Sequence, residues 1–134
     1  MPGEFLDTNI LVHAFTTDPR AAAAQALLGR GCLTSVQAIN EFTNVARRKL
    51  DMTWQEVRDA LAAIRTVCRA ILPMDVETHT EALRIAEQHG YTIFDALMIA
   101  SALRADCAVL YSEDMQDGMA IGARLHIVNP FRDP

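Results

Sequence analysis

Five acidic residues stand where the sequence predicts the ends of strands or the helices around them. Asp7 directly follows the first predicted strand, and Glu113 and Asp114 follow the fourth. Glu41 lies in the helix after the second strand, and Asp95 stands near the start of the apolar helix before the fourth. Because ligands of open α/β sheets bind beyond the carboxyl ends of the strands, we expect these acids to face a common site.

Four carboxylates gathered at one sheet edge would repel one another strongly, and a hard divalent cation would offset that repulsion. Mg²⁺ and Mn²⁺ prefer oxygen ligands, and Mg²⁺ keeps several of its water molecules. Such a site suits the hydrolysis of a phosphodiester, since the metal polarises a phosphoryl oxygen and lowers the pKa of water. The acids therefore predict metal-dependent phosphodiester cleavage.

Each acid also has an ordinary structural explanation when it is considered alone. Glu41 lies at the rim of the buried face of its helix, where a boundary glutamate is common. Asp95 matches the acidic position of a capping box that begins at Thr92. Asp7 and Asp114 lie in sequences typical of polar turns. The hypothesis of a site therefore depends on the four acids together.

Short apolar runs alternate with helical patterns along the chain. Helix starts are indicated by Ser35 and by the capping boxes at 53–56 and 92–95, and Gly90 ends a helix. The expected strands are 4–6, 32–34, 70–72, 107–111 and 125–128. The expected helices are 8–15, 20–28, 36–49, 54–70, from 75 or 78 to 89, and 92–105. This alternation predicts an α/β fold with a parallel sheet and helices on both faces.

The composition narrows the class of protein. The 134 residues are 51% hydrophobic with a net charge of −5, which predicts one globular domain over residues 1–134 and excludes disorder. The longest apolar runs have five residues, against the ~20 that a membrane helix needs. The N-terminus does not resemble a secretory signal, and Cys32, Cys68 and Cys107 are too widely spaced for a zinc site. We expect a cytoplasmic protein with reduced, buried cysteines.

Several motifs resemble those of the PIN domain family, and they occur in the family's order along the whole chain. The segments that carry the resemblance are Phe5–Val12, Asn40–Phe42, Thr92–Ala100, Tyr111–Met115 and the ending at 129–131. The resemblance implies a three-layer α/β/α fold with a central, mostly parallel sheet of about five short strands. It also implies cleavage of RNA with Mg²⁺ or Mn²⁺.

Many small members of the family are VapC-like toxins of type II toxin–antitoxin pairs. The resemblance to them implies a homodimer that a cognate antitoxin inhibits. The RNA substrate stays open, since a transfer, ribosomal or messenger RNA would fit equally well. Unpaired loops are the expected targets, because their bases and backbone are accessible.

The family motifs assign site roles to five acids. By resemblance, Asp7, Glu41, Asp95 and Asp114 form the catalytic metal site, and Asp117 is a weaker candidate for an outer fifth acid. His13 replaces an aromatic residue that is common in the family at that position. We interpret it as a spacer on a partly buried helix.

Substrate contacts are assigned to polar residues close to these acids. Thr8 and Ser35 are candidates for the small hydroxyl residue that the family often has near a strand end, and Asn9 completes the polar turn after Asp7. Arg47 and Arg48 belong to the only basic triplet and could contact phosphate. Their ordinary explanation is that cations stabilise the end of a helix.

Three other classes of protein share some of these features. A signalling receiver domain needs a lysine after its fifth strand, but the only lysine, Lys49, lies on an early helix. A haloacid-dehalogenase-like phosphatase needs a second aspartate where this chain has Asn9. A non-catalytic PIN-fold module that binds protein or RNA is the remaining alternative, and the complete set of acids argues against it.

Overall fold

The computed structural model describes residues 3–132, so the predicted domain limits at residues 1 and 134 lie outside the described residues. The strands are β1 (Gly3–Leu6), β2 (Leu33–Ser35), β3 (Ala70–Leu72), β4 (Cys107–Tyr111), β5 (Ala120–Ile121) and β6 (Leu125–Val128). The helices are α1 (Thr8–Ala14), α2 (Ala21–Leu28), α3 (Val36–Arg48), α4 (Trp54–Val67), α5 (Val76–His89) and α6 (Ile93–Arg104).

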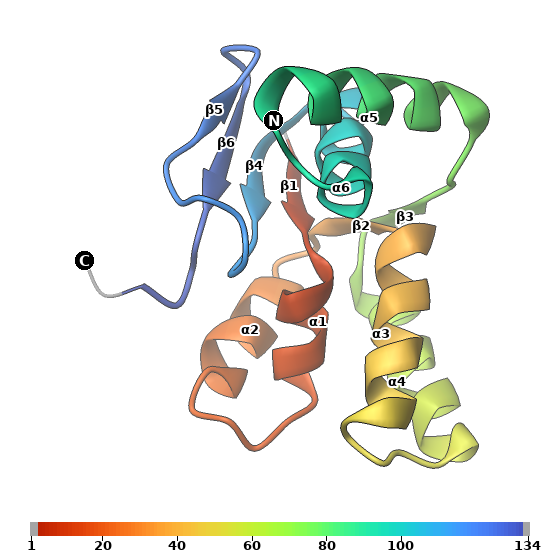
Figure 1. The fold of residues 1–134 in the computed structure, drawn as a ribbon. Coiled ribbons are helices and arrows are strands. Elements are labelled where there is room, and N and C mark those ends of the chain that lie inside the picture. The colour runs from red at the N-terminus through yellow and green to blue at the C-terminus, as the bar shows by residue number, and fades with distance from the viewer. Residues whose placement is uncertain (1–2, 133–134) are drawn as a thin grey trace.

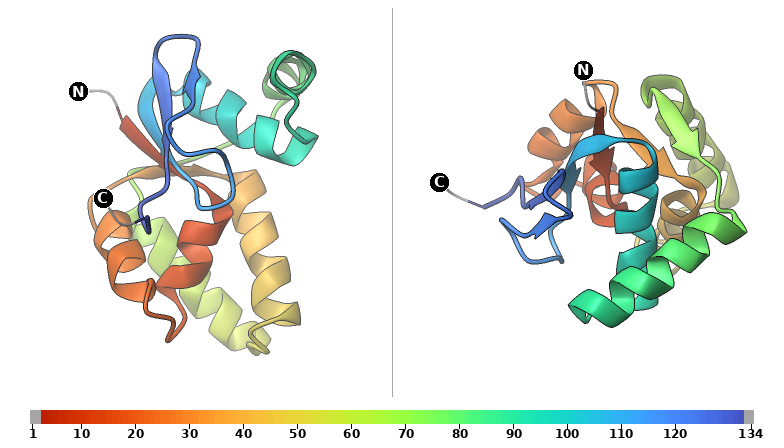
Figure 2. Two further views of the ribbon diagram at one scale, coloured as in Figure 1. Left: turned by 60° about the vertical axis from the view of Figure 1, so that its left-hand side comes forward. Right: turned by 90° about the horizontal axis from the view of Figure 1, so that it is seen from above.

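The strands form one sheet in the order β3-β2-β1-β4-β6-β5, and only the β5–β6 pair is antiparallel. The sheet lies between α1–α4 on one side and α5–α6 on the other (Figures 1 and 2). The predicted three-layer α/β fold is thus confirmed. The sheet has six strands in the described part of the chain rather than about five, because the two residues of β5 are too few to show an alternating pattern.

Local capping chemistry explains where several helices begin. Thr53 and Glu56 form a complete capping box at the start of α4, with side-chain to backbone hydrogen bonds in both directions. The side chain of Asp75 accepts a hydrogen bond from the Thr78 amide at the start of α5. Helix α4 ends at Val67 rather than at residue 70, since Cys68 already has extended backbone angles.

The core packs around β1 and α6. Phe5 and Leu6 of β1 are fully buried, as expected for a central strand. Residues 96–102 of α6 are all buried, which confirms that this helix is enclosed on nearly every side. Strand β4 was expected to be fully buried, but only Cys107 and Leu110 are. On α4, Val57 and Ile64 enter the core whereas Trp54 is 55% exposed.

The three cysteines are free and buried, as the sequence predicts. Burial raises the pKa of each thiol to about 11, so they stay protonated and unreactive at neutral pH. In the part of the chain that the structure describes, no helix combines the length and the apolar character that crossing a membrane requires.

Candidate active site

Asp7 occupies the junction between β1 and α1, at the carboxyl edge of the sheet. Its backbone amide donates to the Tyr111 carbonyl of the neighbouring β4 (3.0 Å). Its Oδ1 accepts a hydrogen bond from the Thr8 amide and its Oδ2 accepts one from Ser112 Oγ, both at 2.7 Å. The residue is only 5% exposed, so its carboxylate is held in one orientation by two donors.

Glu41 reaches the same edge from the second turn of α3. Thr8 Oγ1 donates to Glu41 Oε2 (3.1 Å), so α1 and α3 are joined directly beside Asp7. The start of α3 is fixed by Ser35, whose side chain accepts from the Ala38 amide (3.2 Å). Ser35 is fully buried as a helix cap and does not line the cavity described below.

Asp95 and Asp114 complete the group of four acids from the other side of the sheet edge. Asp95 lies in the first turn of α6, where its amide donates to Thr92 Oγ1 (3.2 Å). Asp114 lies in the exposed loop after β4, and its Oδ2 accepts a hydrogen bond from Asn9 Nδ2 (3.1 Å). Asn9 Oδ1 also accepts from the Glu113 amide (3.1 Å), so this one side chain holds the loop against α1.

Burial and mutual repulsion make Asp7, Glu41 and Asp95 harder to ionise than ordinary carboxylates. Burial, reinforced by the charges of Asp95 and Glu41, raises the pKa of Asp7 to about 6 despite its hydrogen bonds. Burial also raises the pKa of Glu41 and of Asp95, and repulsion from Asp114 adds to the second shift. A cation placed among these groups would relieve the cost of their charge.

The four acids share one cavity of about 680 Å³ at the carboxyl edge of the sheet. Thr8, Asn9 and His13 of α1 also line it. Among residues 3–132, no three His, Cys, Asp or Glu side chains are grouped so that they could hold a metal ion by themselves. Any cation bound here would thus complete its coordination with water or substrate.

Asp117 does not line this cavity. Its Oδ1 accepts a hydrogen bond from the Asn129 amide (2.7 Å), and its Oδ2 lies 3.4 Å from Arg132 Nη1. These contacts join the loop after β4 to the segment after β6. They give Asp117 a structural explanation, and we do not include it in the site proposed below.

The three residues of the basic triplet, at the end of α3, lie in different surroundings. Arg47 donates to the Met52 carbonyl (2.7 Å) and lies over the Trp54 ring at 4.4 Å, so it ties α3 to α4. Arg48 is exposed and, like Arg47, does not line the cavity. Lys49 does line it. Lys49 was not among the predicted site residues.

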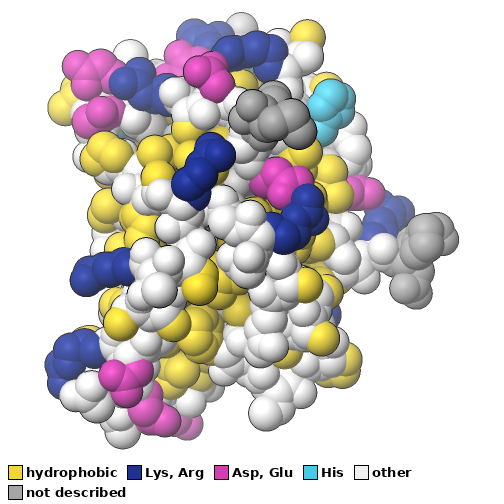
Figure 3. Space-filling model, turned by 180° about the vertical axis from the view of Figure 1, so that it is seen from behind, with side chains coloured by type: hydrophobic (Ala, Val, Ile, Leu, Met, Phe, Trp, Pro, Cys, Tyr) yellow, Lys and Arg dark blue, Asp and Glu magenta, His cyan; other side chains and the backbone are white. Residues whose placement is uncertain are grey.

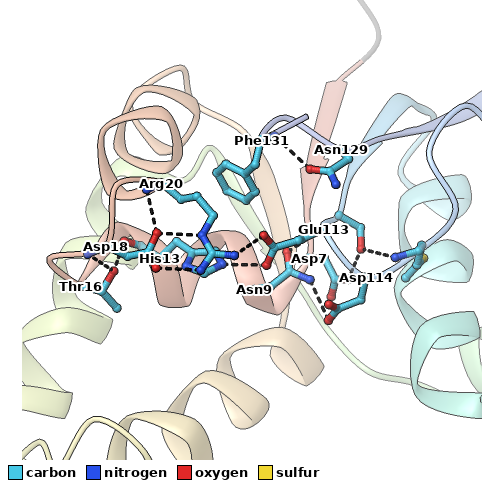
Figure 4. A network of polar contacts seen from close by, with 12 residues as sticks. Asp7, Asn9, His13, Thr16, Asp18, Arg20, Glu113, Asp114, Asn129 and Phe131 are labelled. Carbon is cyan, nitrogen blue, oxygen red and sulfur yellow. Dashed lines mark hydrogen bonds and ion pairs between the residues drawn. The ribbon is translucent and has the colours of Figure 1, made fainter. Parts of the chain in front are cut away.

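A chain of ion pairs flanks the acids and was not predicted (Figure 4). Glu113 Oε1 lies 2.8 Å from His13 Nε2, and Glu113 Oε2 accepts from Arg20 Nη1 at 2.5 Å. Arg20 also binds Asp18 through two hydrogen bonds of 2.7 Å. His13, treated above as a spacer, therefore helps to anchor the loop that carries Asp114.

These contacts also keep Glu113 and Asp18 ionised. Burial raises the pKa of Glu113, but the hydrogen bonds from His13 and Arg20 outweigh it and leave the pKa below its ordinary value. Hydrogen bonds from Arg20 hold the pKa of Asp18 well below its usual range. Both acids are thus ionised and paired at neutral pH, in contrast to the raised pKa values in the cavity.

The face opposite to the view of Figure 1 differs from the acidic cavity in the distribution of its charged side chains. In Figure 3 the basic side chains are spread over several places on this face, and acidic side chains stand beside several of them. This face carries no continuous basic surface of the kind that binds a nucleic-acid backbone by charge alone. The acidic cavity is therefore the stronger candidate for a functional site.

Comparisons with known proteins support this fold. The fold is similar to Mycobacterium tuberculosis VapC20, described as a toxin that cleaves the Sarcin-Ricin loop (TM-score 0.66, 19% identity, 80% of this chain and 86% of that chain). It is also similar to a toxin–antitoxin complex from Klebsiella pneumoniae, with a TM-score of 0.74 and 17% sequence identity, over 97% of this chain and 99% of that chain. A third similar structure is VapBC2 from Rickettsia felis bound to a promoter DNA fragment. Its TM-score is 0.67 and its sequence identity 17%, over 94% of this chain and 98% of that chain.

At these identities the structural likenesses concern the fold, and family membership depends on sequence. No curated protein matches the sequence significantly. The family model of the PIN domain matches residues 5–119, which is most of the chain and includes all four acids of the cavity. This protein therefore belongs to the PIN domain family.

Proposed function

We propose that this protein is an endoribonuclease that uses Mg²⁺ or Mn²⁺ to hydrolyse RNA phosphodiester bonds. The observation that carries the proposal is the convergence of Asp7, Glu41, Asp95 and Asp114, from four separate segments, on one cavity. Membership of the PIN domain family and the fold shared with VapC20 support it. The site is too acidic to bind an RNA phosphate without a cation.

The donor set fits a hard divalent cation. All four candidate ligands are carboxylates, and burial raises the pKa of Asp7, Glu41 and Asp95. Mg²⁺ usually takes one or two carboxylates and keeps several waters, so it does not need a closed group of three protein ligands. When bound, the cation would supply positive charge for the phosphoryl group and a lower pKa for water.

The protein's own residues orient the reacting groups. Asp7 is fixed by its two donors, Glu41 by Thr8, and Asp114 by Asn9. Preorganised carboxylates need little rearrangement when the substrate arrives. Burial and repulsion from Asp114 raise the pKa of Asp95, so its carboxylate is a better proton acceptor than an ordinary aspartate.

The test is cleavage of total RNA and transfer RNA by the purified protein, with Mg²⁺, with Mn²⁺ and with a chelator. Asp95→Asn should abolish cleavage and preserve the fold. Asp59→Asn is the matched control, because Asp59 is exposed on α4, accepts a hydrogen bond from Gln55 and does not line the cavity. Cleavage that persists in Asp95→Asn, or in excess chelator, would refute the proposal. A folded protein that binds metal and cleaves no RNA would favour the interaction-module alternative.

We further propose that the nuclease is the toxin of a type II toxin–antitoxin pair, acting as a cytoplasmic homodimer. Two of the structurally similar proteins are toxin–antitoxin complexes. An apolar groove of about 380 Å³, lined by Phe15, Leu28 and Val67 among others, offers a surface for a protein inhibitor. The product of the neighbouring gene should bind stoichiometrically and stop cleavage. Light scattering should give the mass of two chains, and a monomer would contradict the dimer.

A further inference from the structure

The acidic cavity continues away from the sheet between α1 and α3. Glu41, Val45 and Lys49 all line it, and their spacing of four residues places them along one face of α3 and its cap. Eight residues of helix rise about 12 Å, so the backbone of Lys49 lies about 12 Å from that of Glu41 along this wall. The cavity therefore has an acidic end, at the sheet, and a basic end.

The stretch between these two ends is apolar. Val12 of α1 lines it together with Val45 and Leu50, and all three are half-buried. Val12 also packs against the hydrophobic core, whereas Val45 and Leu50 are not among the side chains packed against it. Apolar side chains that face a cavity instead of the core are typical of ligand-binding surfaces.

Besides the four acids, one further carboxylate lines the cavity, and its charge is compensated. Asp18 accepts three hydrogen bonds from Arg20, two from the guanidinium and one from the backbone amide. Thr16 and Thr17 add only neutral polar groups. Among the described residues Lys49 forms no ion pair, so its ammonium group can pair with an anion in the cavity.

We propose that this part of the cavity binds one unpaired RNA nucleotide next to the cleaved phosphate, a subsite that rests on the proposed ribonuclease function. Its base lies against Val45 and Leu50, and Lys49 binds the next phosphate along the strand. The alternation of acids, apolar side chains and lysine matches the alternation of a metal-bound phosphate, a base and a phosphate. A base can enter only when it is unpaired and unstacked, so the substrate is single-stranded at this point.

The test begins with an RNA oligonucleotide that spans a cleavage site mapped with the wild-type protein. Lys49→Gln should raise KM and lower the salt dependence of log KM by about 1, as expected for one lost phosphate contact. Arg65→Gln is the matched control, because Arg65 is exposed on α4 and does not line the cavity. It should leave KM and its salt dependence unchanged.

The base contact is tested by Leu50→Ala with Leu83→Ala as control, since Leu83 is 52% exposed on α5. Leu50→Ala should raise KM about tenfold with little change in kcat, from the apolar area removed from a half-buried side chain. An oligonucleotide that lacks the base beside the cleaved bond should bind the wild type about tenfold more weakly. It should show no further loss with Leu50→Ala, because both changes remove the same contact.

A measurement on the unmodified protein gives an independent readout. Lys49 is the chain's only lysine, so acylation of a lysine side chain reports on this site alone. Single-stranded RNA should protect Lys49 from an amine-reactive reagent, as read by mass spectrometry, and a blunt RNA duplex should not.

Two results would overturn the subsite and leave the proposed ribonuclease intact. One is metal-dependent cleavage with unchanged KM and salt dependence in both Lys49→Gln and Leu50→Ala. The other is equal cleavage of the same site within a duplex. A wild-type protein that cleaves no RNA with Mg²⁺ or Mn²⁺ would instead refute the proposed function, and the subsite with it.

Discussion

Replacing Asp7 with asparagine should stabilise the metal-free protein while it removes a central acid of the site. Asp7 is 5% exposed, and burial with repulsion from Asp95 and Glu41 raises its pKa from 3.8 to about 6. The folded state therefore ionises this group less readily than the unfolded chain does. A shift of about 2 pKa units corresponds to about 3 kcal/mol of unfolding free energy at pH values well above 6.

The sign of this effect follows from the proton balance. Between pH 3.8 and 6 the folded state holds a proton on Asp7 that the unfolded chain has released, so stability falls as pH rises through this window. This one group should remove about 2 kcal/mol of wild-type stability between about pH 4.5 and pH 7.5. Asparagine cannot ionise, and its amide can still accept from the Thr8 amide and donate to Ser112 Oγ.

The assay is urea unfolding followed by circular dichroism, in chelator, near pH 4.5 and near pH 7.5. The free energy of unfolding of Asp7→Asn should exceed that of the wild type by about 3 kcal/mol at the higher pH and by about 1 kcal/mol at the lower pH. Asp59→Asn is the control and should show no such pH-dependent gap. A pH-independent gap, or an Asp7→Asn variant less stable than wild type near pH 7.5, would show that ionisation of buried Asp7 does not destabilise the fold.

Three further predictions concern the support of the site. Glu113→Gln should lower the cleavage rate 10–100-fold with the fold intact, because it weakens the anchoring of the loop by His13 and Arg20; an unchanged rate constant would contradict this. Ser35→Ala should cost about 1 kcal/mol in urea unfolding, as the loss of a helix cap does, and leave the cleavage rate of the remaining folded protein unchanged. Mn²⁺ affinity, measured by calorimetry, should weaken as pH falls through about 6, since Asp7 is protonated there; equal affinities near pH 5 and pH 7.5 would count against Asp7 as a ligand.

The helices and longer strands could be predicted because their signals are local. The capping box of Thr53 and Glu56 and the left-handed Gly90 mark helix limits within a few residues of sequence. Strand β5, Ala120–Ile121, could not be predicted, because it exists only through its pairing with β6. The predicted end of α4, at residue 70, lies beyond the observed end at Val67 for a similar reason. The Arg69 amide pairs with the Cys32 carbonyl beside β2, and no local pattern shows this contact.

The site could be predicted only in part, because motifs identify residues but do not give their partners. The four cavity acids follow from strand ends and family motifs, and their catalytic roles stay predictions. The pairing of His13 with Glu113 joins residues 100 positions apart, so no local pattern shows it. The signal available in the sequence was a polar side chain, His13, on a mostly apolar helix.

The basic triplet also shows that sequence patterns do not give a residue's partners. Arg47, Arg48 and Lys49 are equivalent as a charge run, and only the packing of α3 against α1 and α4 separates them. Arg47 is directed to Trp54, while Lys49 lines the cavity. Helix periodicity could have placed Lys49 on the face of Glu41, since the two are eight residues apart.

The central claim is that the clustered carboxylates form a metal-dependent centre that cleaves RNA. It is tested most directly by single-turnover cleavage of one mapped RNA oligonucleotide, with protein freed of metal by chelator and then titrated with Mn²⁺. We expect no cleavage before Mn²⁺ is added, a rate that rises and saturates with Mn²⁺ for the wild type, and no restored cleavage for Asp95→Asn. Cleavage by the metal-free wild type, or full restoration in Asp95→Asn, would contradict it.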